Sequence, residues 1–413
     1  MEMKEANIVI VGGGIAGLAT AVGLHRLGLK SLVLESSPCL RVTGAAFTTW
    51  TNAWHALDAL GVGDTLRGEH LRLEGLVAMS AILGVPTAQI AYIDKEAGVE
   101  HEVRCLKRKF VLETLANELP KGTIRFSSKV VCIEDSGYLK ILHLADGTTL
   151  AAKVLIGCDG VNSIVARWLG FQKPSIDERS CIRGYVAFEE SHGFEPKFLQ
   201  FIAGGIRYGI IPCDDKSIYW FFGFPSSWQD NEVTEDPIKM KQFVLSNLGK
   251  VPDKIKNVIQ ETKLEDLSCA QFRYRVPWEM LLKNISKDNV CTAGDAFHPM
   301  TPDLGQGACS ALEDGIVLAR CLAQALKNRS AREECTEEEE YEMIKIGLKK
   351  YASERRWRGF DLVATSYILG LMLNSKTKVV VFLRNKVLAP LFGGLLKQKA
   401  SFHCGQLKIT YDD

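Results

Sequence analysis

Short apolar runs and helical spacing alternate at the start of the chain. The β-branched run 8–11 ends in three glycines, which is typical of a buried parallel strand. Apolar residues then recur at helical spacing over 15–22, and Gly28 offers a helix end. A second apolar run, 31–35, ends in a glutamate. The pattern predicts a strand–helix–strand unit.

The same domain continues further along the chain. Residues 109–119 carry the spacing of an amphipathic helix that stops before Pro120. Residues 139–150 predict a hairpin around Asp146-Gly147, and the run 153–158 returns to the buried-strand pattern.

Aromatic residues in alternation take over from about 181 to 224 and predict an antiparallel sheet inserted into the first domain. Core-strand character returns at 289–295, so the first domain is discontinuous. Thr336 and Glu339 have capping-box spacing at the start of a C-terminal helix. The expected boundaries are 1–80, 100–180 and 285–330 for the first domain, 81–99 and 181–284 for the second, and 331–413 for a C-terminal helical region.

Composition narrows the class of protein. A chain of 413 residues suits two or three domains at ~150 residues each. Its 50 basic and 49 acidic residues nearly cancel, which gives no support for nucleic-acid binding. The 12 cysteines form no CxxC pair, so we expect no metal site and a reducing compartment. With a core strand inside the first ten residues, we expect no targeting peptide and a cytosolic protein.

The C-terminal region contains two apolar stretches. Residues 362–372 are short, and residues 379–396 are broken by charges and a proline, so neither predicts a membrane span. Packing against the main body is the favoured interpretation. Peripheral membrane contact stays open, because Leu371, Leu373, Val379 to Phe382 and Lys386 could form a basic amphipathic surface.

A glycine motif carries the first chemistry. Gly12, Gly14 and Gly17 follow a strand and open a helix, and Glu35 ends the next strand. The glycines allow a tight turn and close approach to a pyrophosphate, while the helix N-terminus supplies free N–H groups. A carboxylate at the end of the second strand can accept hydrogen bonds from ribose hydroxyls, and its negative charge repels a 2′-phosphate. The resident nucleotide is therefore FAD or NAD rather than NADP.

Two further motifs identify a family. One is Gly157-Cys-Asp-Gly-Val-Asn-Ser163, and the other is Ala293-Gly-Asp-Ala-Phe-His-Pro299 followed by Pro302-Asp-Leu-Gly-Gln-Gly307. With the arginine-rich segment 355–358, they make the chain resemble class A flavoprotein monooxygenases, the para-hydroxybenzoate hydroxylase-like group. Among these it is most similar to plant single-component monooxygenases related to zeaxanthin epoxidase. The resemblance covers most of the chain.

The resemblance implies an α/β fold: a Rossmann-like FAD-binding domain with an inserted antiparallel-sheet substrate domain and a C-terminal helical extension. It also implies tight, non-covalent FAD and transient NADPH or NADH. The ADP half of FAD would lie on Gly12, Gly14, Ile15, Ala16, Gly17 and Glu35, with Arg41 and Arg108 near the adenosine and pyrophosphate. Asp159 would be the key acid of its motif, and Asp295 would bind the ribityl chain. Pro302, Gly305, Gln306 and Gly307 would surround the flavin ring, the helix after them stabilising anionic reduced flavin.

The remaining candidate site residues are those that could contact the substrate, and one spacing in the sequence differs from the family pattern. The presumed sheet over the flavin carries Arg183, Tyr185, Phe201, Arg207, Tyr208, Trp220 and Phe222. At period-two spacing Trp220 and Phe222 share one face, and Tyr219 and Phe221 share the other. Sheet core is the simpler interpretation of most of these side chains, and a structural role is the favoured one for His298. Arg167 comes four residues after Ser163, where the family has three, and no second GxGxxG is present.

Together these features predict an FAD-dependent monooxygenase. As the family implies, NAD(P)H reduces the flavin and O2 adds to give a C4a-hydroperoxide, which hydroxylates or epoxidises a small aromatic or unsaturated hydrophobic substrate. One alternative is a reductase or dehydrogenase of an isoprenoid, which would need no oxygen. Another is a non-catalytic flavin-binding scaffold. We expect a monomer or homodimer.

Overall fold

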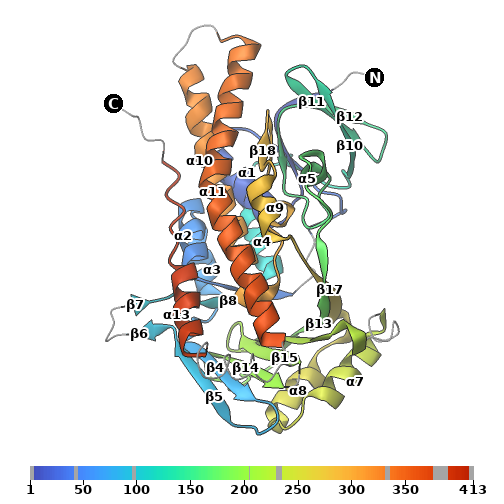
Figure 1. Ribbon diagram of the computed structural model, residues 1–413, viewed down its shortest axis with the longest axis vertical. Helices are drawn as coiled ribbons and strands as arrows, with labels where there is room; N and C mark the ends of the chain where they lie inside the picture. The colour runs from blue at the N-terminus through green and yellow to red at the C-terminus, as the bar shows by residue number, and fades with distance from the viewer. Residues whose placement is uncertain are drawn as a thin grey trace.

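The computed structural model describes residues 4–40, 45–94, 99–203, 205–228, 235–330, 335–374 and 389–408. Two sheets occupy opposite ends of an elongated molecule, and long C-terminal helices run between them (Figure 1). The α/β class and the two-sheet arrangement expected from the sequence are confirmed.

The first sheet brings together strands from distant parts of the chain. Its central strands are β1 (Lys4–Val11) and β12 (Thr149–Gly157), which pair in parallel, and β2 (Leu32–Leu34) pairs in parallel with β1. Strand β19 (Val290–Thr292) pairs in parallel with the last residues of β12. Residues 290–292 thus belong to the first sheet, as expected if the first domain resumes near residue 289. The other strands of this sheet are β9 (Ile124–Arg125), β10 (Val130–Ser136), β11 (Leu139–Leu144) and β18 (Ser286–Lys287).

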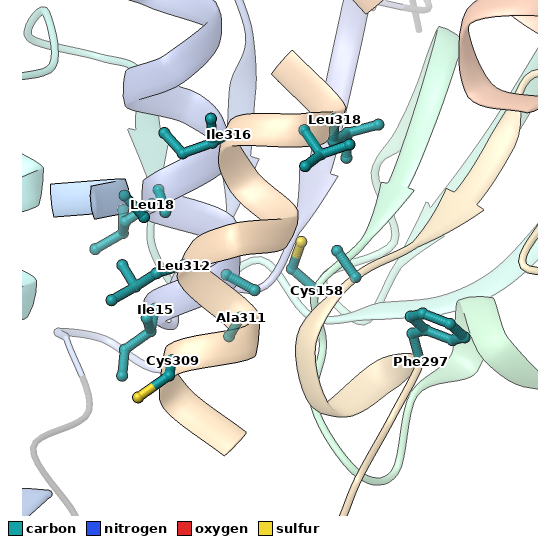
Figure 2. Close-up of a cluster of buried hydrophobic side chains, with 14 of the residues drawn as sticks. Ile15, Leu18, Cys158, Phe297, Cys309, Ala311, Leu312, Ile316 and Leu318 are labelled. Atoms are coloured by element: carbon teal, nitrogen blue, oxygen red, sulfur yellow. The ribbon is translucent and has the colours of Figure 1, made fainter. Parts of the chain in front are cut away.

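Helix α1 (Ile15–Arg26) lies against α10 (Gly307–Ser330), and their side chains form part of the main core (Figure 2). Small residues set the distance between these two helices. A Cβ added to Gly315 would lie 2.8 Å from Cβ of Ala19, and one added to Gly23 would lie 2.8 Å from Cβ of Ala319. Helix α10, which begins at Gly307, is thus packed directly on α1, which begins after Gly14.

The second sheet has the order β17-β13-β16-β15-β14-β4-β5. The aromatic region supplies β13 (Ser175–Ala187), β14 (Lys197–Ala203), β15 (Ile206–Pro212) and β16 (Ser217–Pro225), and β17 (Ser268–Tyr274) flanks β13. These strands pair antiparallel, as predicted. Helices α7 (Pro237–Asn247) and α8 (Asp253–Glu261) supply residues to its second hydrophobic core.

Two strands of the second sheet come from an earlier part of the chain. Strand β4 (Gly75–Ser80) pairs in parallel with β14 and antiparallel with β5 (Pro86–Ala91). The domain boundary expected at residue 80 thus falls at the end of a strand whose partners all belong to the second sheet. The remaining elements are short: β3 (Ala46–Thr49), α2 (Thr51–Leu60), α3 (Gly63–Gly68), β6 (Ile93–Asp94), β7 (Val99–Glu100), β8 (Arg104–Lys107), α4 (Arg108–Asn117), α5 (Ile164–Trp168) and α9 (Pro277–Leu282).

The C-terminal region is helical where the structure describes it. Helix α11 (Glu337–Asn374) begins with a capping box, in which Thr336 N donates to Glu339 Oε2 at 2.9 Å and Glu339 N donates to Thr336 Oγ1 at 3.2 Å. Helix α13 (Ala389–Ala400) packs near the hairpin of β4 and β5, where Gly393 faces Ile90. Among the described residues, no helix combines the length and apolar character needed to cross a bilayer.

Candidate functional site

A cavity of about 440 Å³ lies between loops that carry the nucleotide and flavin motifs and one face of the second sheet. Its walls include most of the residues that the nucleotide and flavin motifs predicted: Gly14, Ile15, Ala16, Arg108, Asp295, Pro302, Gly305 and Gly307. Sequence segments almost 300 residues apart therefore meet at one site. Arg41 lies outside the described residues.

The glycine motif forms the turn that its spacing predicts. Gly12 has φ +105°, and a Cβ there would lie 2.3 Å from the carbonyl oxygen of Cys158. A Cβ on Gly17 would lie 1.9 Å from the oxygen of Gly12, so the start of α1 packs directly on the turn. Gly14 is different, because a Cβ there meets no atom within 4 Å and the residue faces the cavity. Gly12 and Gly17 thus shape the turn, and Gly14 leaves room for a ligand.

Glu35 lies at the end of β2, beside this turn. Its Oε2 accepts from the backbone N of Gly13 at 2.8 Å, and its Oε1 accepts from the N of Ser37 at 2.8 Å. The carboxylate is therefore oriented by the backbone of two loops, next to the glycine motif as predicted.

Asp295 and Arg108 lie on the cavity wall and interact electrostatically. Asp295 is exposed to the cavity, on a short 3-10 helix that follows β19. Burial lowers the pKa of Arg108, and the charge of Asp295 opposes that shift. Arg108 Nε is buried without a hydrogen-bond partner among the described residues. Both groups are thus placed to bind a polar ligand.

Asp159, the acid of the Gly157–Ser163 motif, lies just before a short helix. Its carboxylate accepts hydrogen bonds from Ser163 Oγ and from the N of Ile164, the latter at 2.7 Å. Burial raises its pKa, with these hydrogen bonds opposing the shift. Asp159 therefore stabilises the N-terminus of α5, and its neighbours Cys158 and Gly160 line the cavity. Arg167 is exposed at the end of the same helix.

The flavin-ring motif forms a loop at the N-terminus of α10. Pro302 starts a 3-10 turn, and Gly305 ends it with φ +63°, where a Cβ would lie 3.1 Å from Thr48 Oγ1. Gln306 is buried, and its Oε1 accepts from Asn52 Nδ2 at 2.8 Å. The first turn of α10 opens on the cavity at Gly307. A helix N-terminus there presents free N–H groups and positive potential to the site.

The structure adds a charged group that the sequence analysis did not select. Asp303 is buried and forms hydrogen bonds with Arg179, at 3.0 Å on both oxygens, and with Arg207 at 2.9 Å. Burial favours a raised pKa for Asp303, but these two guanidinium groups lower it overall. The loop that begins at Pro302 is thus fixed to the second sheet by an ion-pair cluster. Asp303 lies inside the Pro302–Gly307 motif, and its charge is the feature of the sequence that could have marked it as a site residue.

The predicted substrate contacts divide between the two faces of the second sheet. Arg183 and Arg207 line the cavity, together with Tyr219 and Phe221. Tyr185 does not line it; the ring is half-buried with Lys107 Nζ 6.0 Å from its centroid.

Trp220, Phe222, Phe201 and Tyr208 lie on the opposite face, in the core against α7 and α8. Trp220 Nε1 donates to Thr262 Oγ1 at 2.8 Å, and Tyr208 Oη donates to the Leu248 oxygen at 2.6 Å. The prediction that Trp220, Phe222 and Tyr208 contact the substrate is therefore wrong. The face of the sheet was misassigned, because both faces are apolar and aromatic.

His298 lies outside the cavity wall and is fully buried. Its Nε2 lies 2.7 Å from Asp314 Oδ2, which also accepts from the N of Gly294. Asp314 Oδ1 in turn accepts from Arg355 Nε at 2.6 Å. This network connects the Gly-Asp turn to α10 and α11, and this packing favours a structural role for His298. No group of His, Cys, Asp or Glu within the described ranges could hold a metal ion.

Comparison with known proteins agrees with this geometry. The model of the FAD-binding-domain family matches residues 5–342. The chain belongs to this family. It is 51% identical to Monooxygenase 2 of Arabidopsis thaliana over 98% of this chain and 99% of that protein. It is 27% identical to 3-hydroxybenzoate 6-hydroxylase of Klebsiella oxytoca over 78% of this chain and 81% of that one.

Solved structures show the same fold. The structure of Klebsiella pneumoniae HpxO with FAD and uric acid superposes with a TM-score of 0.80 and 21% identity, over 96% of each chain. With the family established, the protein is an FAD-dependent monooxygenase with the para-hydroxybenzoate hydroxylase-like fold.

The residues of the site fit FAD independently of these comparisons. Several buried donors have no hydrogen-bond partner within the described part of the chain, and Arg108 Nε, Trp50 Nε1 and Gln306 Nε2 are among them. Arg108 and Trp50 line the cavity beside the open face of Gly14. A bound dinucleotide would supply acceptors to such donors and would lie against a residue that has no side chain.

Proposed function

We propose that the protein hydroxylates a small, negatively charged aromatic compound in this cavity. The observation that supports it is Arg183, a half-buried guanidinium on the cavity wall that makes no ion pair with any described carboxylate. By contrast, Arg179 and Arg207 are both paired with Asp303. A planar cation without a carboxylate partner in a partly dry site favours binding of a carboxylate or another planar anion.

The walls around this cation suit a flat ring. Phe198, Tyr219, Phe221 and Phe272 line the cavity, and the Arg183 guanidinium carbon lies 6.0 Å from the Phe272 ring centroid. Aromatic side chains with one or two polar groups are the usual surroundings of an aromatic ligand. The names of two similar proteins agree, since one acts on 3-hydroxybenzoate and another was solved with uric acid.

We propose that the glycine turn, Glu35, Arg108 and Asp295 hold the FAD, and that Asp295 accepts hydrogen bonds from ribityl hydroxyls. Bound FAD supplies the activation of O2 by electrons from NADPH or NADH. The chain's own residues provide orientation and exclude water. The Asp303 cluster fixes the loop at Pro302, and the start of α10 provides positive potential where negative charge develops.

The test is oxygen uptake driven by NADPH or NADH with paired compounds. Each aromatic acid, such as a hydroxybenzoate or urate, is matched by a neutral isostere, and neutral isoprenoids complete the panel. We expect an acid to stimulate uptake and gain one oxygen atom. Arg183→Gln should raise KM for that acid by roughly tenfold or more and leave neutral compounds unaffected. Arg167→Gln, which removes an exposed arginine outside the cavity, is the matched control.

Preference for neutral compounds, or an unchanged KM in Arg183→Gln, would remove the acidic-substrate proposal while leaving the monooxygenase class intact. Product formation without oxygen would instead favour the reductase alternative. The cytosolic location and the choice between NADPH and NADH stay predictions.

A further inference from the structure

One face of α11 carries a row of exposed apolar side chains. Ile346, Trp357 and Ile368 are spaced by 11 residues, close to three helical turns, and Leu371 follows three residues later. All four are strongly exposed, although the same helix buries other apolar side chains, such as Leu348, Tyr351 and Leu362, against the protein. The row extends for about 38 Å along the helix axis. In Figure 1, α11 runs along the near side of the molecule.

The neighbouring helix α9 widens this row. Trp278 and Leu282 lie one turn apart on α9 and are also exposed. Arg356 Nη1 fixes the two helices together by donating to the oxygens of Met280 and Lys283, at 2.7 and 3.0 Å. The two helices that carry the exposed tryptophans Trp278 and Trp357 are thus fixed to each other.

A basic groove borders Trp357. It has a volume of about 410 Å³ and is lined by Lys345, Lys349 and Arg356, with Asp288 as its one acid. Lys345 is paired with Glu342 at 3.0 Å. Lys349 makes no ion pair with the described residues, and Arg356 donates only to carbonyl groups within that same part of the chain. The groove therefore holds excess positive charge beside exposed indole and aliphatic side chains.

We propose that this face, the row of α11 with Trp278, Leu282 and the basic groove, docks on a membrane surface that contains anionic phospholipid. Tryptophan and lysine side by side are typical of protein surfaces at the headgroup level, where the indole lies among the headgroups and the cation binds phosphate. The charge of the groove favours this partner over a second copy of the chain, which would bring the same cations. The helix lies along the membrane and does not cross it.

The experiment is co-sedimentation of the full-length, FAD-loaded protein with vesicles of phosphatidylcholine, with and without phosphatidylserine. We expect binding to the phosphatidylserine vesicles that weakens at high salt. The variant Leu282→Ser/Trp357→Ser should bind roughly tenfold more weakly. Lys349→Glu should lower binding only to the anionic vesicles. Inorganic phosphate at the same concentration as the phosphatidylserine should not release the protein from the vesicles.

The matched control is Ile82→Ser/Leu83→Ser, at the turn between β4 and β5. Those residues are 62% and 71% exposed, against 66% for Trp357 and 77% for Leu282, so each variant replaces two strongly exposed apolar side chains. The control variant should bind vesicles as the unaltered protein does. Equal losses in both variants, or no binding to any vesicle, would overturn the proposal. A dimer in light scattering that dissociates in Leu282→Ser/Trp357→Ser would also overturn it and would assign the face to a second copy.

Discussion

At the scale of single residues, two glycines of one motif have separate physical tasks. Gly17→Ala would place a methyl group 1.9 Å from a backbone oxygen, whereas Gly14→Ala would place one in open space on the cavity wall. We expect Gly17→Ala to lower the free energy of unfolding by about 3 kcal/mol or more. Gly14→Ala should fold normally and purify without flavin. Urea unfolding and flavin absorbance of the two purified variants measure these effects; normal flavin content in Gly14→Ala would contradict the role given to that residue.

Asp295 provides a second residue-scale prediction. Its carboxylate faces the cavity, so Asp295→Ala should remove a charged hydrogen-bond acceptor and weaken FAD binding by roughly tenfold or more. Titration of the apoprotein with FAD measures the change. Asp64→Ala, which removes an exposed acid on α3, should bind FAD normally. Full occupancy and normal reduction of the Asp295 variant would show that another residue holds the ribityl chain.

The limits of sequence reasoning are clear at this scale. The alternation of 219–222 correctly separates Tyr219 and Phe221 from Trp220 and Phe222. It could not decide which pair faces the cavity, because one face packs on helices and the other on the ligand site, and both require apolar side chains. Asp303 was missed for a related reason: its ion pairs join residues more than 90 positions apart.

At the scale of elements, α11 holds the flavin-ring loop in place. Ser366 Oγ donates to the oxygen of Thr301 at 2.6 Å, one residue before Pro302, and both residues are buried. Ser366→Ala should therefore lower the free energy of unfolding by about 1–2 kcal/mol and shift the flavin absorption bands. Thr365→Ala, a half-buried neighbour on the same helix turn, is the control. Identical spectra and stability in the two variants would show that α11 does not position the loop.

Elements with a strong local pattern were predictable, and pairings between distant elements were not. The glycine turn, α1 and the capping box of α11 follow from adjacent residues. In contrast, the predicted hairpin strand and the buried strand at 153–158 are one continuous strand, β12, which pairs first with β11 and then with β19. Likewise β4 pairs in parallel with β14, more than 110 residues away, and the sequence of β4 alone does not predict which strand it pairs with.

At the scale of the whole molecule, a buried charge network joins the first sheet to the C-terminal helices. Burial raises the pKa of Asp314, but the charges of His298 and Arg355 lower it more, from 3.8 to about 2. The stabilisation is therefore fully present above 3.8, the value in the unfolded chain, and is lost as pH falls through about 2. Urea unfolding across this range should show stability falling with pH.

Asp314→Asn is the test of that assignment. It should be about 3 kcal/mol less stable near neutral pH, because the buried guanidinium of Arg355 loses one of its two carboxylate partners and keeps only Glu313. Its stability should also depend less on pH below 4 than that of the unaltered protein. Asp361→Asn, which changes a partly exposed acid paired with Lys399, should keep the original pH dependence. If the two variants had the same slope, the acid sensitivity would come from other carboxylates.

The parallel partners of β1 also determine when the protein can mature in the cell. Strand β1 needs β12 at 149–157, and β12 needs β19 at 290–292. The cavity is not complete until the loop before Gly307 has been made. At roughly 5–20 residues per second, the ribosome needs about 15–60 s to reach that point. Strand β1 lacks its partner β12 for about the first half of this time, and β12 lacks β19 until residue 292 has been made. FAD can therefore stabilise the folded protein only after the chain has grown past the loop before Gly307.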